Sequence, residues 1–193
     1  QAIRGVGLLG GSIFLLVFLK NLDPRFNLFL GFLTQGAAGY AMSLFDINMT
    51  LWALTWTTML QGFGVGMMWS PITVVTFATL NPRHVPEAAS VFHLLRNIGS
   101  SVHIAISATL VVRSGTISYA EMIEALNPFN ETLAFNALTG VWSIGNESGL
   151  ASLGGEIGRQ AAMIGYVNAY YAYALAAMVA MPLAFLARRP QMA

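Results

Sequence analysis

Long apolar stretches alternate with short polar stretches along the whole chain. Each long stretch has about the 20 residues that a helix needs to cross a bilayer. The five stretches cover residues 2–19, 26–45, 51–80, 91–112 and 166–186. Pro82 and Pro86 follow the third stretch and are expected to stop its helix. The pattern therefore predicts an all-α, polytopic bundle of five membrane-spanning helices.

A longer and more polar connection, residues 114–165, separates the fourth stretch from the fifth. We expect a loop here that carries short helices near residues 117–125, 131–138 and 150–162. Six basic residues fall on or near one side of the predicted membrane: Lys20, Arg25, Arg83, Arg96, Arg188 and Arg189. Because basic residues collect on the cytoplasmic side, the long loop is expected outside and the C-terminus inside.

The composition supports a membrane protein and excludes several other classes. Hydrophobic residues make up 56% of the 193, and charged residues only 9%, whereas soluble domains carry about 25% charged residues. The net charge of +1 gives no general attraction to nucleic acid. The chain has no cysteine, which rules out disulfides and thiolate metal sites. With no paired carboxylates at catalytic spacing, we expect neither an enzyme nor a metal or resident cofactor.

The fourth apolar stretch carries a stripe of polar residues. At 100° per residue, five of them fall within an arc of about 80° on a helix. They are His93, Arg96, Ser100, His103 and Ser107. A charge in mid-membrane costs at least ~2.5 kcal/mol, so the stripe should face protein or water. We favour a cavity wall, and hydrogen bonding between helices with Arg96 snorkelling is the alternative. His103 is the mid-membrane ionisable residue, and we favour a packing role for it over titration.

The third stretch contains small residues at a helical spacing. Gly62 and Gly66 lie four apart, so they share a face and allow another backbone to approach closely, and Gly64 adds a second small position. Pro71 removes a backbone hydrogen bond and should kink the helix. This combination is typical of a moving part, although static packing explains it equally. Gln61 stands beside the glycines and is a candidate for a cavity wall.

The central sequence resembles a known family of transporters. The segment is LQGFGVGMMWSPITVVTFATLNPRHVPEAASVFHLLRNIGSSVHIAISATLVVR. It is similar to a late stretch of the fourteen-helix drug:proton antiporters of the major facilitator superfamily, the EmrB/QacA-like group. The matching positions are Gln61, Gly62, Gly64, Gly66, Pro71, Arg96, Gly99 and Ser101. LDPR, with Asp23 and Arg25, is similar to the end of a cytoplasmic turn in that family.

The resemblance implies what the chain does and where. It implies residues 1–193 as the C-terminal part of a multidrug efflux transporter, with helices ten to fourteen of fourteen. Such a protein exports amphipathic compounds by alternating access in a bacterial cytoplasmic membrane, with the proton as coupling ion. Its partners would be the lipid bilayer, the N-terminal half of the same chain and, in EmrB-like members, a periplasmic adaptor protein. The main proton-carrying carboxylate is expected in that N-terminal half.

Two departures from the family pattern leave an alternative open. The family's cytoplasmic turn is replaced in part by Leu16, Val17, Lys20 and Asn21, and His103 stands where the family usually has glycine. A weakened turn would weaken any charge pairing that locks one state of a transporter. The alternative function is a non-transporting membrane scaffold or assembly protein that keeps the fold.

Overall fold

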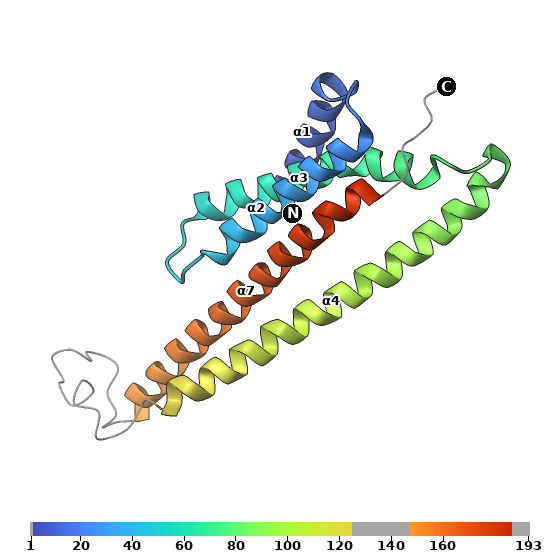
Figure 1. Ribbon diagram of the computed structural model, residues 1–193. Coiled ribbons are helices and arrows are strands. Elements are labelled where there is room, and N and C mark those ends of the chain that lie inside the picture. Colours follow the sequence, from blue (N-terminus) through green and yellow to red (C-terminus); the bar gives the residue numbers. More distant parts are fainter. Residues whose placement is uncertain (1, 125–146, 187–193) are drawn as a thin grey trace. The chain divides into compact units, whose positions relative to one another are not determined.

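The computed structural model describes residues 2–124 and 147–186 (Figure 1). These two ranges contain five α-helices and one short 3-10 helix, and no strand. The prediction of an all-α protein is therefore confirmed for the part of the chain that the structure describes.

The first three helices begin and end within a few residues of the predicted stretches. They are α1 (Ala2–Phe18), α2 (Pro24–Ser43) and α3 (Leu51–Phe77). Local caps set two of the starts. The Asp23 side chain accepts a hydrogen bond from the backbone N–H of Arg25 at 3.1 Å, and Thr50 accepts one from Ala53 at 3.2 Å. Such caps satisfy backbone N–H groups that have no partner inside the helix.

The other two helices extend well beyond the predicted stretches. A 3-10 turn, η1 (Pro82–His84), leads into α4 (Val85–Glu124), and α7 covers Glu147–Leu186. Pro86 lies in the first turn of α4, where its missing N–H removes no intrahelical bond. At 40 residues each, α4 and α7 are about 60 Å long, twice the ~30 Å hydrocarbon core of a bilayer.

Both ends of the 114–165 connection are therefore helical. Residues 114–124 continue α4, and residues 147–165 form the start of α7. The short helices expected near 117–125 and 150–162 are parts of these long helices. The one expected near 131–138 lies outside the described residues.

Two helical segments are long and apolar enough to cross a membrane. They are Pro82–Glu124 and Glu147–Leu186. α1 is apolar but has 17 residues. α2 and α3 have 20 and 27 residues, and their glycine, threonine and glutamine residues lower the hydropathy. Among the described residues, length and composition therefore mark two of the five helices as candidate spans, and the prediction of five spans is not confirmed.

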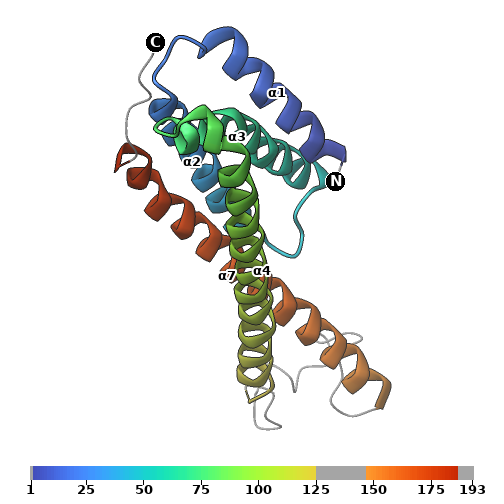
Figure 2. The same ribbon diagram turned by 90° about the vertical axis from the view of Figure 1, so that its right-hand side faces the viewer.

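The described residues form two compact units. The first contains residues 2–104 and 170–186, and the second contains residues 105–124 and 147–169. In the first unit, α3 packs against both α1 and α2 (Figure 2).

Glycines bring the backbones of α1 and α3 into direct contact. A Cβ atom added at Gly62 would overlap the carbonyl oxygen of Arg4. One added at Gly66 would overlap that of Leu8. Two glycines of α1 lie against α3 carbonyl oxygens in the same way, namely Gly7 and Gly11. Two small residues four apart on each helix thus permit a close approach of the kind seen in membrane bundles.

Gly64 lies on the side of α3 that faces α2. A Cβ at Gly64 would come within 3.1 Å of the Gln35 amide nitrogen and 3.2 Å of the Gly31 carbonyl oxygen. α2 in turn packs on the last part of α7, where a Cβ at Gly39 would lie 3.2 Å from Ala174. Small residues therefore place the polar side chain of Gln35 between α3 and α7.

The second unit is an antiparallel pair formed by the end of α4 and the start of α7. A Cβ added at Gly115 would lie 3.4 Å from the carbonyl oxygen of Ala161, and one at Gly165 would overlap that of Val111. The earlier residue of α4, Val111, thus meets the later residue of α7, Gly165, so the two segments run in opposite directions.

Candidate functional site

A buried amide side chain joins three helices of the first unit. Gln35 of α2 is 4% exposed. Its Nε2 donates a hydrogen bond to the backbone carbonyl of Gln61 in α3 at 2.9 Å. Its Oε1 accepts a hydrogen bond from the hydroxyl of Tyr173 in α7. Because an unsatisfied buried polar group is costly, these two bonds stabilise the position of all three helices.

His103 of α4 stands beside this network. Its ring centroid is 6.1 Å from that of Tyr173. Gln35, His103 and Tyr173 line a cavity of about 310 Å³, whose other walls are apolar side chains of α2, α3 and α7. This cavity offers an amide, an imidazole and a phenol to any molecule that enters it.

Arg96, two turns before His103 on α4, contacts an aromatic ring of α3. Its guanidinium carbon lies 4.2 Å from the centroid of the Trp69 ring, which is a cation–π geometry. The pair lines a second cavity of about 610 Å³ with Phe77, Phe92 and His93. Val65 and Met68 of α3 line both cavities, so the two lie side by side along α3.

The five residues of the predicted polar stripe on α4 have different surroundings in the structure. His93 and Arg96 line the larger cavity, and His103 lines the smaller one. Ser100 is exposed and donates its hydroxyl to the carbonyl of Asn97 in its own helix, at 2.9 Å. Ser107 is half-buried and belongs to the second unit. The structure therefore brings three of the five stripe residues to cavities.

The other predicted site residues of α3 and α4 have different surroundings. Gln61 is half-buried, and its backbone carbonyl is the group that binds Gln35. Pro71 is buried inside α3. A Cβ added at Gly99 would meet no atom of the described residues within 4 Å. Within that part of the chain, Gly99 therefore makes no close helix contact.

Two side-chain hydrogen bonds stabilise the turn between α1 and α2, which the sequence predicts to be cytoplasmic. Asp23 caps α2 through the N–H of Arg25. The side chain of Asn27 donates to the carbonyl of Leu19 at 3.3 Å, across the turn. The Nε of Arg25 is buried and has no hydrogen-bond partner among the described residues.

Sequence reasoning missed Gln35 and Tyr173. The available signal was a lone glutamine in the middle of an apolar stretch, since such a residue must find a partner inside the bundle. Nothing local in the sequence connects the two residues.

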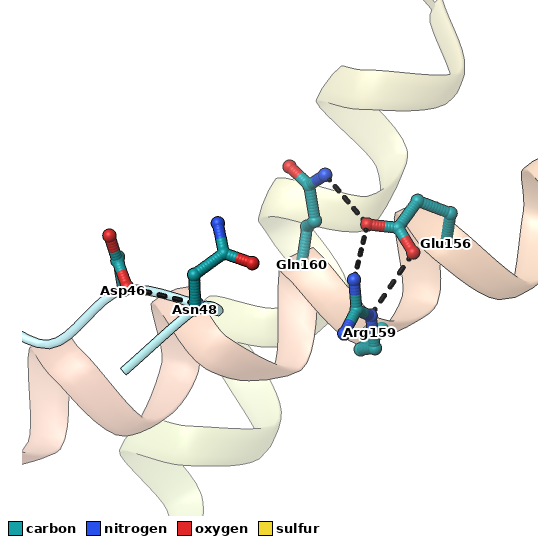
Figure 3. A network of polar contacts seen from close by, with 5 residues as sticks. All are labelled: Asp46, Asn48, Glu156, Arg159 and Gln160. Atoms are coloured by element: carbon teal, nitrogen blue, oxygen red, sulfur yellow. Dashed lines mark hydrogen bonds and ion pairs between the residues drawn. The ribbon is translucent and has the colours of Figure 1, made fainter. Parts of the chain in front are cut away.

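Three polar side chains of α7 form a hydrogen-bonded cluster in the second unit, and it contains an ion pair. Arg159 donates two hydrogen bonds to the carboxylate of Glu156, at 3.1 and 3.0 Å, and Gln160 donates a third at 3.0 Å (Figure 3). The bonds from Arg159, followed by the one from Gln160, lower the pKa of Glu156 from its usual value.

In the turn before α3, the backbone N–H of Asn48 donates to the Asp46 carboxylate at 2.9 Å (Figure 3).

Comparison with known proteins finds relatives among export proteins. The chain is 27% identical to the multidrug export protein EmrB of Escherichia coli K12 over 114 residues, which are 58% of this chain and 22% of EmrB. The chain is similar to EmrB over this stretch. The resemblance predicted from the sequence is thereby confirmed.

Two further relatives agree with this assignment. The fatty acid resistance protein FarB of Neisseria gonorrhoeae is 25% identical over 174 residues, 90% of this chain and 34% of FarB. EmrB of Haemophilus influenzae is 23% identical over 114 residues, 58% of this chain and 22% of that protein. The chain thus spans between about a fifth and a third of the length of these relatives. No family model and no solved structure matches it.

Proposed function

We propose that the chain is the C-terminal part of a proton-coupled multidrug efflux transporter that exports amphipathic compounds by alternating access. The observation that carries the proposal is the pair of adjoining cavities between apolar helices, lined by polar side chains of α2, α4 and α7. The relatives named for multidrug export and fatty acid resistance support the same direction.

In this proposal, five helices cross the membrane. α1, α2 and α3 have 17, 20 and 27 residues, which correspond to about 26, 30 and 40 Å against a ~30 Å hydrocarbon core. α4 has no buried residue, and its exposed apolar side chains include Leu95, Ile98 and Val102. Lipid and the upstream helices of the full protein would cover this surface.

The rest of the machinery lies upstream in this proposal. Transporters of repeated helical bundles bind substrate near the bilayer midplane, between bundles that move against each other. Proton coupling requires a group whose protonation differs between the two states. We place the main proton-carrying carboxylate in the N-terminal half of the full protein. The C-terminus is cytoplasmic and the 114–165 segment is outside, where it is a candidate surface for a periplasmic adaptor.

The test uses the full-length protein in a bacterial strain that lacks its own efflux pumps. Growth is measured against a panel of amphipathic compounds, and a pH-sensitive fluorescent protein reports the cytoplasmic pH. We expect resistance to some of the compounds and cytoplasmic acidification when they are added. If the protein reaches the membrane at a normal level but neither effect occurs, the scaffold alternative replaces this proposal.

A further inference from the structure

We propose that Met68 of α3 forms a movable partition between the two cavities, and that its position selects which compounds the protein exports. This inference rests on the proposed function and names a residue that determines its specificity. Three features carry it: the place of Met68 in both cavity walls, its contact with Gly31, and the freedom of its side chain to move.

Met68 belongs to the walls of both cavities. It shares this property with Val65. Beyond these two residues, the larger cavity continues along α3 to Trp69 and Ile72, and the smaller one is lined by side chains of α2, α4 and α7. Because residues three and four apart share a face of a helix, Met68 lies on the face of α3 that both cavities use. A molecule that extends from one cavity to the other therefore passes Met68.

The side chain of Met68 occupies the space that a side chain at position 31 would fill. A Cβ atom added at Gly31 would overlap Cγ of Met68 and lie 2.9 Å from its sulfur. It would also lie 3.4 Å from the carbonyl oxygen of Gly64, so the backbones of α2 and α3 approach closely here. Gly31 is buried and Met68 is half-buried. A Met68 side chain that leaves Gly31 has no room between these backbones and moves toward the cavities.

Of the two residues that line both cavities, Met68 is the one that can move. Methionine is unbranched and has three rotatable side-chain bonds, so its thioether adapts to neighbouring groups. Val65 is branched at Cβ and is held near one rotamer in a helix. Proteins that bind molecules of several shapes use flexible methionine side chains in this way. The passage between the cavities is widest with Met68 against Gly31, and it narrows when Met68 turns toward them.

A narrowed passage should distinguish rigid molecules from flexible ones. A fused-ring compound cannot bend around a displaced thioether, whereas an alkyl chain rotates about its single bonds and can pass it. A methyl group added at Gly31 pushes Met68 toward the cavities, so it should impair the export of rigid compounds more than that of flexible ones. Truncation of Met68 in the same variant should remove the obstacle.

The experiment measures growth inhibition in the strain without efflux pumps, with the full-length protein at equal levels in the membrane. Ethidium and proflavine are the rigid cations, and dodecyltrimethylammonium is the flexible cation of equal charge. We expect Gly31→Ala to lower resistance to the two dyes at least fourfold and resistance to the flexible cation less than twofold. Met68→Ala added to Gly31→Ala should restore dye resistance to within twofold of Met68→Ala alone.

Gly36→Ala is the matched control. Gly36 is a buried glycine of α2 that lines neither cavity. A Cβ atom there would also face a methionine, Met178, but at 3.6 Å, which is an ordinary contact. This variant should keep resistance to all three compounds.

Methionine-methyl NMR of the purified full-length protein tests the displacement itself, with Met68→Leu to assign the signal. The Met68 signal should shift in Gly31→Ala and stay in place in Gly36→Ala. An unchanged signal in Gly31→Ala overturns the inference. Equal losses of resistance to rigid and flexible cations overturn it too, as does a double variant that exports no better than Gly31→Ala.

Failure of this inference is distinguishable from failure of the proposed function. A wild-type protein that gives resistance, with Gly31→Ala matching Gly36→Ala, keeps the function and loses the role of Met68. The same holds for a wild-type protein that gives resistance to other compounds but to neither dye. A wild-type protein that gives resistance to no compound loses the function, and the role of Met68 in specificity is lost with it.

Discussion

The hydroxyl of Tyr173 donates a hydrogen bond to the side-chain oxygen of Gln35, 138 residues earlier in the chain. The same glutamine donates to the backbone of Gln61. One buried side chain thus connects α2, α3 and α7, and it lies at the wall of the smaller cavity. The helices that form this cavity are therefore joined by a polar contact as well as by small residues.

Tyr173→Phe should destabilise the full-length protein. The substitution keeps the ring but removes the donor to Gln35, and hydrogen bonds between membrane helices are typically worth about 0.6–2 kcal/mol. Thermal unfolding of the purified protein in detergent measures the loss. Tyr171→Phe is the control, because Tyr171 is 51% exposed. Equal unfolding temperatures for the two variants would contradict a stabilising role for this bond.

Gly62→Ala should disrupt the contact between α1 and α3. The new Cβ would overlap the carbonyl oxygen of Arg4, and backbone cannot move aside as a flexible side chain can. Overpacking of this kind costs about 1–3 kcal/mol, so we expect a lower protein level in the membrane and a lower unfolding temperature. Gly99→Ala is the matched control, since its Cβ meets no described atom within 4 Å. A wild-type level for Gly62→Ala would show that the two helices separate without loss.

The two faces of α4 should differ in their access to water. The chain has no cysteine, so single cysteines can be introduced in a cysteine-free background of the full protein. In intact membranes, a charged thiol reagent should label Ser100→Cys and Ser107→Cys but not Val102→Cys and Leu110→Cys. Labelling of neither pair would favour interhelical packing as the role of the stripe.

His103→Gly should leave proton coupling intact. The histidine lines the smaller cavity, but the proton-carrying group is expected in the upstream half of the protein. Substrate-induced acidification of the cytoplasm should therefore match the wild type at equal protein level, while the range of exported compounds widens, because the cavity gains volume. A variant that still binds substrate but moves no protons would assign coupling to His103.

The pairing of Glu156 with Arg159 should depend on pH. The hydrogen bonds from Arg159 and Gln160 lower the pKa of Glu156 below its usual value of about 4.5. The pairing is therefore complete above that usual value and is lost as the pH falls through the lowered pKa. Carboxyl-selective NMR of the full protein measures the titration, with Glu156→Gln to assign the signal. Arg159→Gln should raise the pKa toward the usual value, and no change would show that the bonds do not form in solution.

Local signals in the sequence predicted α1, α2 and α3 closely. Apolar runs, prolines and capping residues act over a few neighbouring positions, so the starts at Pro24 and Leu51 could be read nearly correctly. The same signals placed α4 and α7 but missed both ends of α4 and the start of α7. The hydropathy pattern shows where an apolar stretch ends. The helices α4 and α7 nevertheless extend into the more polar residues beside these stretches, because a helix does not need apolar side chains to continue.

The sequence alone determined the helical class, the approximate helices, the shared face of the α4 polar residues and the glycine face of α3, because helical periodicity fixes which side chains lie together. Only the tertiary structure decided what those faces contact. It paired Arg96 with Trp69 and Gln35 with Tyr173, and it placed the glycines of α3 against the backbone of α1. The physical reason is that such partners depend on how whole helices pack across long separations in sequence, and no short-range pattern specifies that packing.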